Sequence, residues 1–263
     1  MASLLDQIVV ATRRQVAETQ RSANVSELER RAAEHRVRGF RRRLQEKAAG
    51  GVAVIAELKK ASPSKGLIRA DFDASRLAAE LEAAGAVALS VLTDKKYFQG
   101  SLENLRRASA ATAIPCLRKD FIVDEFQLLE ARVNCADAVL LIVAALARGE
   151  LVRLAGKARE AGLDVLCEVH DAEELKRAAD AGCDLIGVNN RDLRTFQVDL
   201  GTSLRLAEQM PANAVRVAES GIHSAEDIAK LRTVGFHAFL IGESLMKAEH
   251  PGKALQVLLK AES

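Results

Sequence analysis

The segment Val52-Ala-Val-Ile-Ala-Glu-Leu58 is apolar at every position except Glu57, and seven runs of the same kind follow it. The runs are short and continuously apolar rather than alternating, which is the pattern of parallel strands that helices cover. Neighbouring runs start on average about 27 residues apart, the length of a strand with its following helix. The eight runs begin near Val52, Val87, Ile114, Ala138, Val165, Leu185, Val215 and Ala238.

The segments between these runs have the apolar spacing of helices, as in Leu77 and Leu81, which stand four residues apart. A residue that tolerates the left-handed backbone of a helix end precedes most of the runs: Gly85, Asn134, Gly162, Gly182 and Gly235. The chain has eight strand-helix units and no second region of different composition. This predicts an α/β fold, a closed (β/α)8 TIM barrel over residues 51–263. An open sheet is less favoured, because the sequence lacks the Gly-x-Gly-x-x-Gly of nucleotide-binding sheets.

Residues 1–50 precede the barrel, and their pattern predicts an N-terminal helical extension. The stretch from Arg36 to Lys47 is strongly basic and has three interpretations. It can be a solvated helix face, an arm over the barrel mouth that attracts an anionic substrate, or a patch that binds nucleic acid. The last is the weakest, because the remaining chain is acidic. We therefore expect residues 1–50 to act as a lid or arm.

The composition argues against several classes of protein. The 263 residues carry 38 Lys and Arg against 36 Asp and Glu, and a net charge of +2 favours neither nucleic acid nor a membrane as partner. With 8 Phe, 1 Tyr and no Trp, the chain has little material for a stacking surface. Its longest uncharged apolar run, residues 138–147, falls well short of the ~20 residues of a membrane span. No signal-peptide core opens the chain, so we expect a cytoplasmic protein.

Cysteine and histidine spacing gives no sign of a metal site. The four cysteines form no Cys-x-x-Cys pair, and the five histidines form no His-x-x-x-His pair. Because most of the cysteines lie in or beside apolar runs, we expect buried, reduced thiols rather than disulfides or zinc ligands. We also expect no bound metal and no cofactor.

Polar residues gather at the ends of the predicted strands, where barrel enzymes place their catalytic groups. Lysines and glutamates in such a site suit general acid-base chemistry, and glycine-containing turns after the last two strands suit a phosphate held by backbone N–H groups. A phosphorylated small molecule with a carbonyl to be protonated fits this set. In chain order the set is Glu57 and Lys59, Thr93, Lys119 and Asp120, Glu168, Asn189 and Arg191, Glu219 with Ser220 and Gly221, and Gly242 with Glu243.

Six motifs in order and at family spacing, spread between about Phe40 and Met246, closely resemble the indole-3-glycerol-phosphate synthase family. They are Ala56-Glu-Leu-Lys-Lys-Ala-Ser-Pro-Ser-Lys-Gly66, Ser90-Val-Leu-Thr-Asp-Lys-Lys-Tyr-Phe-Gln-Gly-Ser101, Arg118-Lys-Asp-Phe-Ile-Val-Asp124, Gly187-Val-Asn-Asn-Arg-Asp-Leu193, Ala218-Glu-Ser-Gly-Ile222 and Phe239-Leu-Ile-Gly-Glu-Ser-Leu-Met246. The resemblance implies a carboxy-lyase of tryptophan biosynthesis. Such an enzyme converts 1-(2-carboxyphenylamino)-1-deoxyribulose 5-phosphate into indole-3-glycerol phosphate, carbon dioxide and water. Association with other enzymes of that pathway stays open.

The resemblance also implies a role for each site residue. Lys119 would be the general acid of ring closure, and Glu168 would serve the later dehydration. The other assignments follow in the same way: Glu57 and Lys59 in proton transfer, with Lys59 also binding substrate, Asn189 in orientation, Ser62 and Arg191 at the anthranilate carboxylate, Phe98 on the aromatic ring, and Glu219, Ser220, Gly221, Gly242 and Glu243 on the substrate and its phosphate.

One position departs from the family pattern, because several members carry Ser where this chain has Glu243. A carboxylate repels a phosphate, so we expect the backbone N–H of Glu243 to bind and its side chain to turn away. The nearest alternative is phosphoribosylanthranilate isomerase, which has a catalytic cysteine at the end of the first strand, where this chain reads Glu57-Leu-Lys59. A non-catalytic barrel that binds through its basic arm is the other alternative, and the retained acid-base residues argue against it.

Overall fold

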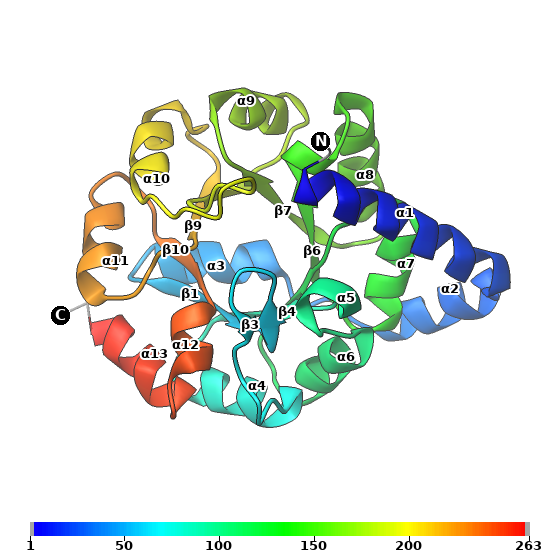
Figure 1. Ribbon diagram of the computed structural model, residues 1–263, viewed down its shortest axis with the longest axis horizontal. Coiled ribbons are helices and arrows are strands. Elements are labelled where there is room, and N and C mark those ends of the chain that lie inside the picture. The colour runs from blue at the N-terminus through cyan, green and yellow to red at the C-terminus, as the bar shows by residue number, and fades with distance from the viewer. Residues whose placement is uncertain (1–2, 261–263) are drawn as a thin grey trace.

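The computed structural model describes residues 3–260 and contains the predicted barrel (Figure 1). Eight parallel strands pair in the closed order β1-β10-β9-β8-β7-β6-β5-β4. Each strand of the barrel falls on one of the eight predicted runs, so the predicted fold is confirmed. The strands are β1 (Ala53–Leu58), β4 (Ala88–Leu92), β5 (Cys116–Lys119), β6 (Ala138–Ile142), β7 (Asp164–Val169), β8 (Leu185–Asn189), β9 (Val215–Glu219) and β10 (Ala238–Ile241).

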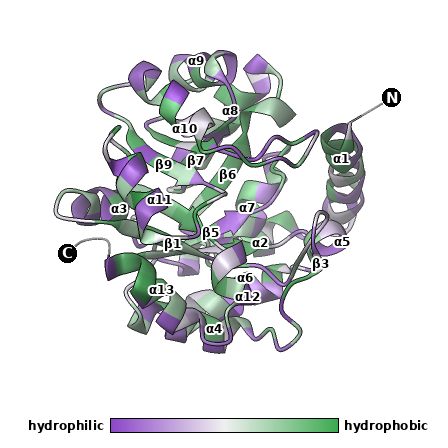
Figure 2. Ribbon diagram, turned by 60° about the vertical axis from the view of Figure 1, so that its left-hand side comes forward, coloured by the Kyte–Doolittle hydropathy of each residue, from purple (hydrophilic) through white to green (hydrophobic). Residues whose placement is uncertain are grey.

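Side chains alternate between two apolar cores along each strand, because successive residues of a strand point to opposite faces. In β1, Val54 and Leu58 pack outward against the helices, whereas Ala53 and Ile55 belong to the core inside the barrel. Glu57 follows the same alternation and therefore points inward. The strands thus contribute apolar residues to both cores, and green, the colour of hydrophobic residues, recurs along them in Figure 2.

Helices surround the barrel, and several begin at a side chain that accepts a backbone N–H of the first turn, such as Asp73, Ser101, Asp171 and Ser224. These helices are α4 (Ala74–Ala83), α6 (Leu102–Ala110), α7 (Phe126–Val133), α8 (Arg148–Glu160), α9 (Ala172–Asp180), α10 (Gly201–Leu206), α11 (Ala225–Arg232), α12 (Glu243–Lys247) and α13 (Pro251–Leu259), with short 3-10 turns η1 (Val143–Ala145) and η2 (Ala207–Gln209).

Three helices precede the barrel: α1 (Leu4–Ser22), α2 (Val25–Glu34) and α3 (Phe40–Ala48). In Figure 2, α1 and α3 lie on opposite sides of the barrel. Phe40 and Leu44 of α3 are fully buried in the core inside the barrel, where they contact the first residues of the strands. Helix α3 therefore closes the end of the barrel at which the strands begin.

The hypothesis that the basic stretch reaches over the barrel mouth is wrong. Arg38 donates to both Oδ atoms of Asp137, with its Nη2 2.6 Å from Oδ2, and the Arg41 side chain forms an ion pair with Asp184. Asp137 and Asp184 each directly precede a strand, so these arginines lie at the far end from the strand termini. The carboxylates before the strands attract the basic stretch, which the sequence pattern could not show.

The loop after β1 contains an additional antiparallel hairpin, β2 (Ala61–Ser62) and β3 (Gly66–Leu67), and the loop after β4 contains the one-turn helix α5 (Lys95–Phe98). All four cysteines are free thiols, and three of them are buried. Within residues 3–260, no helix is long and apolar enough to cross a membrane.

Candidate active site

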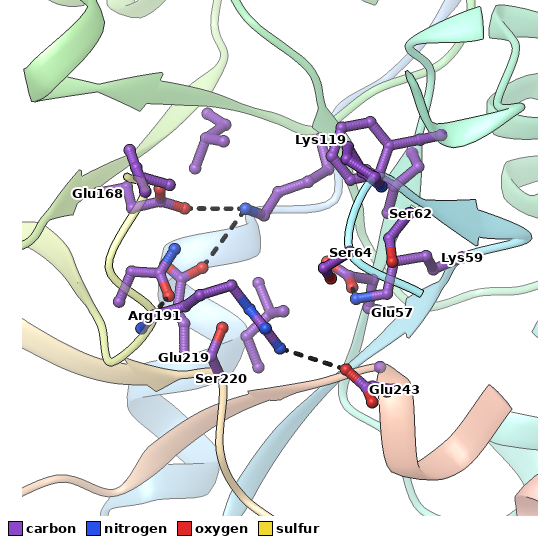
Figure 3. A pocket seen from close by; sticks show the side chains of 18 of the residues that line it. Glu57, Lys59, Ser62, Ser64, Lys119, Glu168, Arg191, Glu219, Ser220 and Glu243 are labelled. Atoms are coloured by element: carbon purple, nitrogen blue, oxygen red, sulfur yellow. Dashed lines mark hydrogen bonds and ion pairs between the residues drawn. The ribbon is translucent and has the colours of Figure 1, made fainter. Parts of the chain in front are cut away.

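A pocket opens at the carboxyl ends of the barrel strands, and all thirteen predicted site residues line it (Figure 3). The strand alternation explains why the charged ones point inward. Lys119 has the same parity as the buried interior residue Leu117, and Glu168 has that of Leu166. The predicted site residues are Glu57, Lys59, Ser62, Phe98, Lys119, Glu168, Asn189, Arg191, Glu219, Ser220, Gly221, Gly242 and Glu243.

Lys119 is at the centre of the buried charges. Its Nζ lies 2.9 Å from Oε2 of Glu168 and 3.5 Å from Oε2 of Glu219, as the dashed lines in Figure 3 show. Glu219 fits beside them only because residue 187 is glycine, since a Cβ there would meet Glu219 Oε1 at 2.0 Å. Three alternate strands of the barrel, β5, β7 and β9, thus bring one ammonium group and two carboxylates into contact.

This arrangement shifts the pKa of each partner. Burial disfavours the charged form of Lys119, but the carboxylates of Glu168, Glu219 and Glu57 outweigh this and raise its pKa. Burial also disfavours a charged Glu168, yet Lys119, His170 and a hydrogen bond from Asn189 lower its pKa to about 2. At neutral pH, the site therefore presents a charged ammonium group next to an ionised carboxylate.

Glu219 differs from Glu168 although both contact Lys119. Burial, assisted by the neighbouring carboxylates of Glu168 and Glu57, raises the pKa of Glu219 to about 8, against the opposing effect of Lys119. Two carboxylates that share one ammonium cannot both ionise easily, so one keeps a proton. Residue Glu219 is thus a buried acid beside Lys119 and Glu168. Sequence reasoning listed it with the substrate contacts and could not detect this state.

A second ion pair lies on the other side of the pocket. Lys59 Nζ lies 2.5 Å from Glu57 Oε1. Gly242 makes room for this pair, because a Cβ at that position would meet Glu57 Oε1 at 2.5 Å. Gly242 therefore does more than permit a turn after β10. It lets the Glu57 carboxylate lie against the next strand.

The side chain of Glu243 does not turn away as expected. Its Oε2 lies 3.2 Å from Arg191 Nη2 (Figure 3). Its Oε1 accepts a hydrogen bond from Lys247 Nζ at 2.6 Å. Burial raises the pKa of Glu243, but Lys247, Arg191 and Lys65 outweigh this and lower it, so the group is ionised. The Arg191 guanidinium, which the resemblance assigns to the substrate carboxylate, thus forms an ion pair with the Glu243 carboxylate of the protein itself.

The turn after β9 has an uncommon backbone. Ser220 has a φ of 65° and Gly221 one of 79°, so two consecutive residues are left-handed. A non-glycine residue such as Ser220 adopts this conformation at a cost, and it is often found at ligand sites. At position 221 a Cβ would meet Val198 Cγ1 at 2.5 Å, so glycine is required there. The strained turn borders the pocket.

Aromatic and aliphatic side chains form the remaining wall. The rings of Phe98 and Phe121 lie 6.3 Å apart at 39°. From α1, Leu4, Leu5 and Ile8 reach the same pocket. Sequence reasoning missed Phe121 and the three α1 residues as pocket residues. The apolar spacing at the start of α1 was the only available signal, because their distance from the barrel strands in the sequence hides the contact.

A polar network supports the strand that carries Lys119. Arg118, the residue before Lys119, points outward. Its Nη1 donates to the carbonyl of Gln127 at 2.7 Å, and its Nη2 donates to Asp120 Oδ2 at 3.0 Å. Thr93 Oγ1 donates to the same Asp120 oxygen at 2.5 Å. The predicted strand-end residues Thr93 and Asp120 thus belong to a structural network, although Asp120 also borders the pocket. In residues 3–260, no group of three or more His, Cys, Asp or Glu could hold a metal ion.

Comparison with known proteins gives close matches in sequence and wider ones in fold. A family model described as indole-3-glycerol phosphate synthase matches residues 5–258. An indole-3-glycerol phosphate synthase of Koribacter versatilis (strain Ellin345) is 63% identical over 259 residues, 98% of this chain and 100% of that protein.

Two solved structures are similar in fold alone. A 3-hexulose-6-phosphate synthase has a TM-score of 0.64 at 13% identity, covering 81% of this chain and 100% of that one. A thiamine phosphate pyrophosphorylase from Pyrococcus furiosus has a TM-score of 0.60 at 18% identity, covering 82% of this chain and 96% of that one.

Proposed function

Because the chain belongs to the indole-3-glycerol phosphate synthase family, we propose that the pocket at the strand ends performs the reaction of that family. The enzyme is a carboxy-lyase of tryptophan biosynthesis. Its substrate, 1-(2-carboxyphenylamino)-1-deoxyribulose 5-phosphate, loses carbon dioxide and water as the indole ring closes. The product is indole-3-glycerol phosphate. The roles given below to individual side chains are our proposals.

Lys119 serves ring closure as the general acid. The aryl carbon that bears the carboxylate attacks the ribulose carbonyl, and charge develops on the carbonyl oxygen. A buried ammonium group with a raised pKa can stabilise that charge and deliver a proton to it. The C–C bond to the carboxylate then breaks, carbon dioxide leaves, and its electron pair restores the aromatic ring.

Glu168 serves the dehydration that follows. Because its carboxylate is ionised, it can accept the proton that the intermediate loses. The hydroxyl group leaves as water after it takes a proton from the ammonium group of Lys59. Asn189, which hydrogen-bonds to Glu168, orients the carboxylate. Glu57 and Lys59 form the second pair. We assign Lys59 to substrate binding and proton exchange, with Glu57 holding its ammonium in place.

Four residues are placed to receive the anthranilate part of the substrate. The Arg191 guanidinium and the Ser62 hydroxyl suit its carboxylate, and Phe98 with Phe121 suits its ring. Arg191 must exchange its ion pair with Glu243 for the substrate carboxylate. The phosphate fits the backbone N–H groups around Ser220, Gly221, Gly242 and Glu243, where the left-handed turn exposes them.

The observation that carries these assignments is the contact of Lys119 with Glu168 inside a pocket whose other side has the Lys59–Glu57 pair. A turnover assay on the carboxyphenylamino substrate tests them. The protein has no tryptophan, so indole fluorescence of the product rises over a low background. Purified enzyme should produce this signal together with stoichiometric carbon dioxide. Absence of turnover, or isomerisation without carbon dioxide, would overturn the proposal.

We further propose that the enzyme works in the cytoplasm and binds no nucleic acid. An ionised phosphate ester crosses a bilayer only at a large energetic cost, so the enzyme must share a compartment with the reaction that makes its substrate. Arg38 and Arg41 of the basic stretch are engaged by aspartates of the barrel, which leaves fewer cations for an outside partner.

A further inference from the structure

A histidine and a glutamate lie behind the proposed dehydration base. His170 follows β7 two residues after Glu168, and its Nε2 lies 3.5 Å from Glu168 Oε1. On the other side of the ring, Nδ1 lies 3.0 Å from Glu174 Oε2, and the same oxygen accepts the backbone N–H of His170 at 2.9 Å. Glu174 is in the first turn of α9, whose N-cap Asp171 anchors it. The imidazole is thus hydrogen-bonded at Nδ1, whereas the buried Nε2 has no hydrogen-bond partner among residues 3–260 and faces the Glu168 carboxylate at ion-pair distance.

The geometry indicates the charge state of this ring. A carboxylate at Nδ1 requires a proton there. If Nε2 were unprotonated, its lone pair would face an ionised carboxylate oxygen, whereas a protonated Nε2 is attracted to it. The carboxylates that act on the ring are Glu174 of α9, Glu168 of β7 and, more distantly, Glu219 of β9. Burial lowers the pKa of His170, but these three groups outweigh it and raise the pKa.

We propose that His170, held by Glu174, is a positioning residue that keeps Glu168 ionised and oriented from behind as an imidazolium; this inference rests on the proposed role of Glu168. His170 is absent from the pocket wall, and its side chain is only 14% exposed. It therefore acts through Glu168 rather than on the substrate. No proton needs to move along this path.

A second cation beside Glu168 is needed because of the role proposed for Lys119. In the free enzyme, Lys119 contacts Oε2 of Glu168 and His170 faces Oε1. When Lys119 gives its proton to the substrate oxygen, it becomes a neutral amine, and Glu168 loses its nearest positive charge. An imidazolium on the far side still opposes protonation of Glu168. The carboxylate then remains a base for the dehydration step.

The pH dependence of kcat is the main test. In wild-type enzyme, kcat should fall as the pH rises through the pKa of His170, which is above its ordinary 6.5. His170→Gln keeps a donor but no charge, so this limb of the profile should disappear. Its kcat should be about tenfold below the wild-type plateau, the equivalent of about 1.4 kcal/mol for one lost charge contact. KM should stay within about twofold, because His170 does not touch the pocket. A merely structural role would lower kcat equally at all pH values.

Glu174→Gln is a second test variant, which keeps the proposal testable if His170→Gln fails to fold. Without the carboxylate, the pKa of His170 should drop, and the kcat limb should move to lower pH by about one unit. His250→Gln is the matched control, since His250 is an exposed histidine that also neighbours a glutamate, and it should change neither limb nor plateau. An unshifted limb in Glu174→Gln, or a wild-type profile in His170→Gln, would overturn the inference.

Glu168→Gln separates this inference from the proposed function. If Glu168→Gln turns over normally, the role of Glu168 is wrong. The contact can then still be tested without turnover by NMR titration of the His170 ring, whose pKa should be lower in Glu168→Gln than in wild type. If Glu168→Gln is impaired while that titration is unchanged, the proposed function stands and the inference about His170 fails.

Discussion

At the scale of single residues, the surroundings of two lysines differ more than their sequence positions suggest. Lys59 pairs with the Glu57 carboxylate, whereas Lys119 contacts two carboxylates and is influenced by a third. A group that must donate a proton during ring closure needs a charge that persists in a buried site. Lys119 meets this requirement through its neighbours, which is why we assign it the acid role.

Lys119→Met should lower kcat by at least ~100-fold, because methionine keeps the stem but removes both the charge and the proton. Indole fluorescence in a steady-state assay measures this. Lys176→Met, at an exposed position, is the control and should retain wild-type turnover. Near-normal turnover in Lys119→Met would make Lys59 the better candidate for the acid.

Glu168→Gln should also slow turnover but still permit the first condensation, since Lys119 remains. Rapid quench of this variant should therefore show carbon dioxide released ahead of the indole product. Release of both products at the same reduced rate would contradict the separate roles of Lys119 and Glu168.

Glu243→Ser should leave KM unchanged or lower it, because Arg191 and Lys247 lose a carboxylate that competes with the anionic substrate. Glu243→Gln keeps most of the side-chain volume and removes the charge, so it should behave similarly. Steady-state kinetics at constant ionic strength measure the effect. A tenfold rise in KM, about 1.4 kcal/mol of lost binding, would show that the Glu243 side chain supports the substrate.

At the scale of elements, the N-terminal helices have separate tasks at opposite ends of the barrel. Helix α1 supplies Leu4, Leu5 and Ile8 to the pocket wall, whereas α3 buries Phe40 in the core below the strands. The sequence interpretation treated residues 1–50 as one lid or arm. The contacts of α3 favour grouping it with the barrel, and the boundary itself stays a prediction.

Removing residues 1–34 should leave a folded barrel that binds substrate less well, since α1 and α2 are lost but α3 and the Arg38 contact to Asp137 are kept. We expect a cooperative melting transition and a KM that rises by about tenfold. In contrast, Phe40→Ala in the full chain should lose about 3–5 kcal/mol of stability. A truncated chain without a cooperative transition, or a Phe40→Ala variant as stable as wild type, would contradict this division.

At the scale of the whole molecule, the barrel gathers buried charges that an open sheet would spread along its edge. Strands β1, β5, β7 and β9 each direct an ionisable residue into the same small volume. Their mutual effects decide which groups are charged. This charge pattern makes the stability of the fold depend on pH, and we propose that it also serves catalysis.

Glu219 makes that stability depend on pH. Its pKa is about 8 in the folded protein, above the ordinary value of 4.5. The folded state therefore holds the proton more tightly, and the resulting stabilisation is complete below about pH 4.5 and is lost as the pH rises through 8. In Glu219→Gln the side chain is neutral at every pH. The Tm of this variant should therefore decrease by a few degrees less than that of the wild type between pH 6 and 9.

Differential scanning calorimetry at several pH values measures this difference. Glu249→Gln, at a highly exposed position, is the control and should follow the wild-type curve. If Glu219→Gln and wild type lose Tm in parallel, Glu219 is ionised in the folded protein and its assigned state is wrong.

The sequence by itself determined the barrel and the strand-end residues that line its pocket, but not the pocket residues that come from α1. Both depend on local patterns, since an apolar run defines a strand and its alternation sends every second residue inward. A polar residue at an inward-facing position near the end of such a run, such as Lys119 or Glu168, therefore reaches the strand-end pocket. The family was also recognisable from these short motifs and is confirmed by the comparisons.

Only the tertiary structure decided the charge of Glu219, the pairing of Arg191 with Glu243, and the position of α3 beneath the barrel. Each depends on groups that come from distant segments, and electrostatic energies change steeply with distance and burial. A linear pattern shows which side chain a position carries, but not which charge lies three ångströms away. That information exists only once the strands have closed into a barrel.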